Sequence, residues 1–232
     1  MSFGWPRRHF RATDSTNTRA RELAAAGAPH GTVVTAGEQS QGRGRQGRTW
    51  TAPPGGALLY SAIVRPLEER HLMLPLAVPL AVCAAAGELS PGIECGVKWP
   101  NDVHLDDRKL AGVLIEARPQ DGWAVIGVGL NLFITPEQFP PELRETAISL
   151  GTDADIDTAA RSLSSHLAAW IEADPETVLA EWRARDVLKG REIAWEDGSG
   201  IADGVDDRGY LAVVVPGGER IFLGAGEVHL RL

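Results

Sequence analysis

Residues 96–133 read GVKWPNDVHLDDRKLAGVLIEARPQDGWAVIGVGLNLF, and this stretch indicates the fold class. It holds three strand-like runs rich in aliphatic residues, at 96–105, 109–117 and 123–133. Pro100 interrupts the first run, because a proline has no N–H to donate within a sheet. The stretch therefore predicts several short strands of a sheet.

The sequence on either side of this stretch adds separate helices and further strands. Residues 38–56 and 136–150 show no regular apolar pattern. Pro75 and Pro79 crowd the first turns of an apolar helix, so we expect that helix to start late. The pattern is typical of an α+β fold, with strands at 7–12, 31–36 and 57–64 and helices at 17–26, 72–89, 156–172 and 175–185.

The composition changes near Asp186, which suggests a second unit. From there to Leu232 the chain has nine glycines and several short alternating runs separated by turn signals. Five strands of about five residues each are typical of a small β-barrel. We therefore predict two domains, 1–185 and 186–232.

The totals describe an acidic chain with an ordinary apolar content. Of 232 residues, 44% are hydrophobic and 23% charged, and the formal net charge is −8. A bulk nucleic-acid binder usually has the opposite charge balance, so an anion site has to be local. Two cysteines, no signal peptide and no apolar run of about 18 residues predict a cytoplasmic protein without a membrane span.

The loop Gly42-Arg43-Gly44-Arg45-Gln46-Gly47-Arg48-Thr49-Trp50 concentrates positive charge on this acidic chain. It contains a formal G-x-G-x-x-G, but the Pro-Pro-Gly-Gly that follows cannot start the helix that a dinucleotide fingerprint requires. A P-loop is excluded, because its Gly-Lys-Ser/Thr is missing. Glycines let the backbone approach a ligand, and guanidinium groups bind polyphosphates and carboxylates. A solvated basic loop and a nucleic-acid-binding arginine–glycine segment are the alternatives to such an anion site.

Three β-rich segments carry polar or glycine interruptions that a buried strand does not normally accept. They are Lys98-Trp99-Pro100-Asn101-Asp102, Lys109-Leu110-Ala111-Gly112 and Gly127-Val128-Gly129-Leu130-Asn131. Buried polar groups need partners or a use, and a glycine inside a strand often marks close approach by a ligand. Lys98 and Lys109 are two of only three lysines, whereas 20 of the 23 basic residues are arginine. With the arginine loop, these segments indicate one site.

In combination, these motifs resemble the biotin–protein ligase family. The matching segments occur in the family's order: Asp14-Ser15-Thr16-Asn17, Gln39, the loop 42–50, Lys98–Asp102, Arg108–Gly112 and Gly127-x-Gly129-x-Asn131. The resemblance implies a mixed-sheet catalytic domain of the class II synthetase/biotin–lipoate ligase type. It also implies a C-terminal SH3-like β-barrel, which would end near Gly226-Glu227-Val228.

The family's reaction has two steps, and biotin, ATP and Mg²⁺ are its implied ligands. The biotin carboxylate attacks the α-phosphate of ATP, which gives biotinyl-5'-adenylate and pyrophosphate. A lysine of a biotin carboxyl carrier domain, in a carboxylase such as acetyl-CoA carboxylase, then attacks the mixed anhydride. Mg²⁺ would be held mainly by the ATP phosphates, and no residue is assigned to it with certainty.

The resemblance also implies roles for individual residues. The catalytic residues would be Lys109, Arg43 and Arg45, to which we add Asp102 as a hypothesis of our own. The biotin pocket would be lined by Ser15, Thr16, Asn17, Gln39, Arg43, Gly44, Arg45, Trp50, Lys109 and Gly112. ATP or the adenylate would contact Arg43, Arg45, Arg48, Trp50, Lys98, Asn101, Lys109 and Asn131.

Asp102 is our candidate for accepting the proton of the acceptor lysine, whose reference pKa is near 10.4. A turn cap before Val103 is the alternative role for this carboxylate. We also expect the loop 42–50 to be mobile without ligand and to become ordered over biotin or the adenylate.

Two other functions stay open at this point. A lipoate–protein ligase shares the fold class and the chemistry, and a non-catalytic biotin-sensing module would use the same pocket. Many family members carry an N-terminal DNA-binding domain, but here the catalytic match begins within the first fifteen residues, so we expect no DNA binding. A homodimer through the sheet edge is left open, since no sequence feature demonstrates it.

Overall fold

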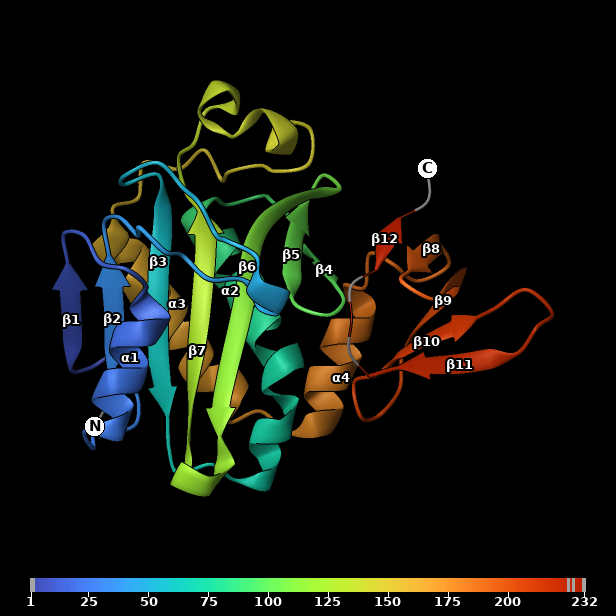
Figure 1. The fold of residues 1–232 in the computed structure, drawn as a ribbon, viewed down its shortest axis with the longest axis horizontal. Coiled ribbons are helices and arrows are strands. Elements are labelled where there is room, and N and C mark those ends of the chain that lie inside the picture. Colours follow the sequence, from blue (N-terminus) through green and yellow to red (C-terminus); the bar gives the residue numbers. More distant parts are fainter. Residues whose placement is uncertain (1–2, 225, 227, 231–232) are drawn as a thin grey trace.

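The computed structural model describes residues 3–224, 226 and 228–230, and a seven-stranded mixed sheet forms its larger part (Figure 1). Its strands are β1 (Arg7–Phe10), β2 (Val33–Ala36), β3 (Ala57–Val64), β4 (Gly96–Lys98), β5 (Asp102–Leu105), β6 (Arg108–Arg118) and β7 (Trp123–Asn131). They lie in the order β1-β2-β3-β7-β6-β5-β4. β1 and β2 are parallel, and the other neighbours are antiparallel. The predicted α+β class with a mixed sheet is confirmed.

Helices cover the two faces of this sheet unequally. α1 (Thr16–Ala25) packs on one face, against β2, β3 and β7. α2 (Leu74–Leu89) and α3 (Ile156–Ile171) pack on the other face, and α4 (Pro175–Ala184) packs against α2 (Figure 1). The main hydrophobic core lies on the α2 and α3 side, which leaves part of the α1 face for other uses.

The alternation of strand side chains decides which residues face α1. On β3, Leu58 and Tyr60 point into the main core, so Leu59 and Ser61 point to the α1 face. The strand register then aligns further residues with them across the sheet: Ser61 with Gly127, and Leu59 with Gly129, Gly112 and Asp102. The glycines and the carboxylate that the sequence singled out therefore share one face.

The apolar helix α2 starts late, as expected, two residues after the start at 72 that the sequence suggested. It begins at Leu74 with Pro75 in its first turn, and a 3-10 turn (Glu69–Met73) precedes it, whereas Pro79 lies inside the helix. The helical stretch Glu69–Leu89 is also long and apolar enough to cross a membrane, so the prediction that no such run exists was wrong. Most of this stretch is buried within the fold, which is typical of a core helix.

The C-terminal region forms a separate five-stranded sheet. Its strands are β8 (Glu192–Trp195), β9 (Gly198–Val205), β10 (Leu211–Val214), β11 (Arg220–Leu223) and β12 (His229–Leu230), in the order β11-β10-β9-β8-β12. The SH3-like barrel stays a prediction, since β11 and β12 stand at opposite ends of this order within the described residues. Glu227 of the predicted barrel end lies outside the described residues.

The two sheets share one hydrophobic core. Ile193 of β8 and Leu211 of β10 are fully buried in the same cluster as Leu80 of α2. The backbone N–H of Val97 in β4 donates to Arg185 O, directly after α4. The division at residue 185 therefore stays a proposal about folding units that are packed together.

A substitution on the central strand β7 tests how tightly the side chains of this core are packed. Ile126 is fully buried in the main cluster. We expect Ile126→Val to lower the free energy of unfolding by about 1 kcal/mol, because one methylene is removed and a small void remains. Urea unfolding of the two proteins checks this value, and an unchanged midpoint would contradict the packing described here.

Candidate active site

The α1 face of the large sheet carries a cavity of about 760 Å³, within the range of small-molecule sites. The loop 42–50 covers one side of it, and residues of α1 and of the strands β3 to β7 line most of the remainder, together with the segment 139–147 and two residues of the C-terminal region. The structure places every residue predicted for the site on this cavity: Ser15, Thr16, Asn17, Gln39, Arg43, Gly44, Arg45, Arg48, Trp50, Lys98, Asn101, Asp102, Lys109, Gly112 and Asn131. Their individual roles stay predictions.

One end of the cavity is a buried polar cluster at the start of α1. Thr16 is 4% exposed, and both its N–H and its hydroxyl donate to Gln39 Oε1, at 2.7 Å and 3.0 Å. Ser15 occupies the N-cap position of α1 without a side-chain capping hydrogen bond. Because Gln39 Oε1 accepts twice, its amide nitrogen is the group left for a ligand.

The amide of Asn17 is held in one orientation. Its Oδ1 lies 2.6 Å from the Ser61 hydroxyl, and its Nδ2 donates to Glu116 Oε2 at 2.9 Å. Because both amide hydrogens of Nδ2 face acceptors on β6, Oδ1 is the atom that keeps capacity for a ligand. A Cβ on Gly127 would lie 2.2 Å from this Oδ1, so residue 127 has to be glycine.

The indole of Trp50 forms a second wall of the cavity. The loop folds back on itself through Gly44 N–H to Arg48 O at 2.8 Å and Trp50 N–H to Gly42 O at 3.0 Å. This brings the indole over Gly129, where a Cβ would lie 2.3 Å from a ring atom. Among the described residues, the buried Trp50 Nε1 finds no hydrogen-bond partner. The glycine on β7 therefore makes room for an aromatic ring that belongs to a distant loop.

This close approach makes a prediction about Gly129→Ala. The added methyl has to displace the indole, so we expect the near-ultraviolet circular dichroism to change and the stability to fall by about 1–3 kcal/mol. Gly87→Ala is the matched control, because a Cβ at that α2 position meets no atom within 4 Å. If both variants resembled the wild type, the Trp50 position described here would be wrong.

The other end of the cavity is basic. Lys109 Nζ lies 2.7 Å from Asp102 Oδ1 and 5.8 Å from the centroid of the Trp50 ring. Arg45 Nη1 donates to Asn101 Oδ1 at 3.4 Å, and Arg48 and Lys98 also line this part. The cavity lining holds six Arg and Lys side chains and three carboxylates, which leaves a positive field on a chain whose net charge is −8. Such an end suits a phosphate or a carboxylate.

The two asparagines predicted for the nucleotide also hold the backbone together. Asn101 Nδ2 donates to Val113 O at 2.7 Å, which ties the β4–β5 hairpin to β6. Asn131 Nδ2 donates to Ile148 O at 2.9 Å, and Lys109 N–H donates to Thr146 O at 2.7 Å. The irregular segment 136–150 is thereby fixed beside Lys109. The backbone bonds use only the amide nitrogens, so each oxygen keeps acceptor capacity at the cavity, although Asn101 Oδ1 already accepts from Arg45.

Sequence reasoning missed several residues that shape the site. Ser61 is fully buried within an apolar strand, and His104, Arg191 and His229 line the cavity. Burial and the Lys98 charge lower the pKa of His104 to about 4, so its ring is neutral near pH 7. An unusual polar residue in an aliphatic strand is the one signal that could have indicated Ser61.

A metal held by the protein alone is not supported by the donor set. Within residues 3–224, 226 and 228–230 no group of three or more His, Cys, Asp or Glu side chains could hold a metal ion. The nearest carboxylate to the basic end, Asp102, already pairs with Lys109. These residues fit Mg²⁺ only as an ion that is coordinated mainly by phosphate oxygens of ATP, with at most one or two ligands from the protein.

Comparisons with known proteins agree with this site. A biotin–[acetyl-CoA-carboxylase] ligase of Mycobacterium tuberculosis is 38% identical over 94% of this chain and 87% of its own length. The protein of that name in Paracoccus denitrificans is 32% identical, over 93% of this chain and 97% of its own. The Aquifex aeolicus biotin protein ligase in complex with biotin and ATP superposes with a TM-score of 0.80 at 27% identity, over 97% of this chain and 98% of that one. The family model that matches residues 9–131 leads to the same result: the chain belongs to the biotin/lipoate A/B protein ligase family.

Proposed function

We propose that this chain is a biotin–protein ligase that forms biotinyl-5'-adenylate from biotin and ATP and transfers biotin to a lysine of a carboxyl carrier domain. The relatives named above are enzymes of this type. The buried polar cluster at one end of the cavity suits the biotin half of this intermediate, and the basic end suits its adenylate half. A cytoplasmic location, the two domains 1–185 and 186–232 and an SH3-like C-terminal barrel are parts of the same proposal.

The buried polar cluster at the start of α1 is the observation that favours biotin over lipoate as the substrate. A ureido ring offers two N–H donors and one carbonyl acceptor, and Asn17 Oδ1 and Gln39 Nε2 provide complementary groups. A dithiolane ring has no such groups, so it would leave Gln39 Nε2 without an acceptor on the ligand and would give Asn17 Oδ1 no second donor beside Ser61. A site built for hydrogen bonds rejects a ligand that cannot pair with its polar groups, by factors of about 10⁴. The pocket therefore favours biotin.

In the first step, the biotin carboxylate oxygen attacks the α-phosphorus and pyrophosphate leaves. Lys109 lies where a cation can neutralise the carboxylate and the charge that develops on the α-phosphate. Arg43, Arg45 and Arg48 of the loop would cover the phosphates. Trp50 would exclude water from the mixed anhydride. Mg²⁺, when bound with ATP, supplies charge neutralisation at the leaving pyrophosphate.

In the second step, the neutral amine of the acceptor lysine attacks the carbonyl carbon of the anhydride. The C–O bond to AMP breaks, an amide bond forms, and one proton leaves the lysine nitrogen. Asp102 is the carboxylate at the reacting end and would accept this proton. A carrier domain is thus the proposed partner; no DNA binding is expected, and a homodimer stays open.

ATP-dependent transfer of labelled biotin to a carboxylase carrier domain tests this function. We expect ATP–pyrophosphate exchange that depends on biotin and is not supported by lipoate. Exchange with lipoate alone would indicate the lipoate ligase instead. Binding of biotin without any exchange would indicate a sensing module.

A further inference from the structure

Glu116 is a carboxylate outside the cavity that the proposed mechanism does not use. It lies on β6, on the same face as Gly112, two residues beyond Leu114, which lines the cavity. Its side chain is only 20% exposed. A half-buried carboxylate on a largely aliphatic strand calls for a specific partner.

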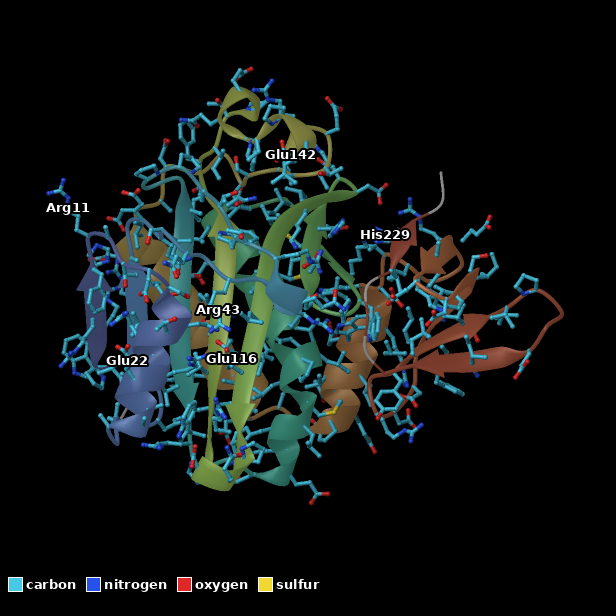
Figure 2. The ribbon with its side chains drawn as sticks, in the orientation of Figure 1. Arg11, Glu22, Arg43, Glu116, Glu142 and His229 are labelled. Atoms are coloured by element: carbon cyan, nitrogen blue, oxygen red, sulfur yellow. The ribbon has the colours of Figure 1, made fainter. Side chains whose placement is uncertain are left out.

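Glu116 has partners on two other segments of the chain. Asn17 and Arg21 of α1 reach it, at 2.9 Å from Nδ2 to Oε2 and 2.9 Å from Nη1 to Oε1. Arg43 of the loop reaches it with Nη1 at 3.1 Å from Oε1. Figure 2 shows Arg43 and Glu116 side by side over the sheet. One carboxylate therefore joins β6, α1 and the loop that covers the cavity.

The contact with Asn17 sets the polarity of the pocket. An amide side chain can present either its oxygen or its nitrogen to a ligand, and the flip exchanges an acceptor for a donor. A carboxylate accepts hydrogen bonds only, so Glu116 requires the nitrogen of Asn17 on its side. The oxygen is then directed to Ser61 and the cavity.

The contact with Arg43 anchors the loop in the absence of substrate. Burial opposes ionisation, but the hydrogen bonds from Asn17 and Arg21 and the charge of Arg43 outweigh it and lower the pKa of Glu116 below its usual value. The carboxylate is therefore charged near pH 7. Arg43 is 44% exposed, so its ion pair with Glu116 is open to screening by salt.

We infer that Glu116 is a positioning residue: it orients the Asn17 amide for the ureido ring and anchors the covering loop through Arg43. This inference rests on the proposed function for its effect on biotin. Its effect on the loop does not depend on that function. Glu116 acts on the pocket through two other side chains and touches no substrate, so it should change substrate binding and leave the chemical step largely alone.

Glu116→Gln removes the charge and keeps the size of the side chain. In ATP–pyrophosphate exchange we expect KM for biotin to rise about tenfold with kcat within about twofold of wild type. In the ligand-free protein we expect trypsin to cleave at Arg43–Arg48 about fivefold faster, as followed by mass spectrometry. Glu22→Gln is the matched control, because Glu22 pairs with Arg19 on the exposed side of α1 (Figure 2). It should change neither measurement.

The inference is overturned if Glu116→Gln equals Glu22→Gln in both measurements, or if kcat falls while KM stays constant. If Glu116→Gln does not fold, the ion pair can be weakened in the wild-type protein by salt. Raising sodium chloride from about 0.05 M to about 0.5 M should then accelerate cleavage of the loop relative to cleavage elsewhere in the chain. A salt-independent ratio would contradict the anchor. A wild-type protein without biotin-dependent exchange would refute the proposed function, while the cleavage comparison would still decide the anchor.

Discussion

Replacing Lys109 by alanine should lower the rate of biotin-dependent ATP–pyrophosphate exchange by about a thousandfold. Its ammonium pairs with Asp102 and stands beside Trp50, at the point where we propose that the carboxylate of biotin meets the α-phosphate. Two anionic groups cannot approach each other without a neutralising charge in a site that excludes water. The neighbouring arginines carry planar, delocalised charges, whereas the ammonium of Lys109 is a compact point charge.

Lys189→Ala is the matched control for this prediction. Lys189 is exposed between α4 and β8, and it lies outside the cavity lining. Its removal deletes the same charge from the chain and should leave exchange unchanged. Binding of biotin, measured by equilibrium dialysis, should weaken far less than exchange in Lys109→Ala. Exchange at more than about a tenth of the wild-type rate would show that Lys109 is not the neutralising group.

Much of the fold could be predicted because local signals agree with the final structure. The strand 57–64 matches β3, and the helices at 156–172 and 175–185 match α3 and α4 within one residue at each end. The interruption at Pro100 corresponds to the β4–β5 hairpin. The order of the strands was not predictable, because β3 pairs with β7, which follows it by about sixty residues. Such pairing depends on burial of both faces, which no local pattern reports.

The site could be predicted as a set of residues but not as a geometry. The motifs place polar groups and glycines at strand interruptions, and one face of the sheet brings them together. Ser61 and Glu116 escaped notice because each stands among aliphatic neighbours on its strand, and their importance lies in contacts with α1 and the loop. Arg191 stands directly before β8 and lies at the rim beside Asp107, with which it forms an ion pair across more than eighty residues.

Asp102→Asn should separate the two steps of the reaction. We expect transfer from preformed biotinyl-adenylate to the carrier domain to slow about a hundredfold near pH 7, with exchange slowed by less than about tenfold. The carboxylate lies on β5, in register with Gly112, and its Oδ1 contacts Lys109 Nζ at 2.7 Å on the cavity side. It is directed into the site, which favours a role there over the cap of the preceding turn.

The pH dependence distinguishes proton acceptance from support of Lys109. A lysine near its reference pKa of about 10.4 is almost fully protonated at pH 7, so a base is needed to release the amine. As the pH rises toward about 9.5, more of the acceptor loses its proton to water, and the defect of Asp102→Asn should shrink about tenfold or more. Asp106→Asn is the control, because this exposed turn residue has a φ of 50° that asparagine also adopts. If Asp102 only held Lys109 in position, Asp102→Asn would slow exchange and transfer by the same factor. The loss of transfer would then not diminish as the pH rises.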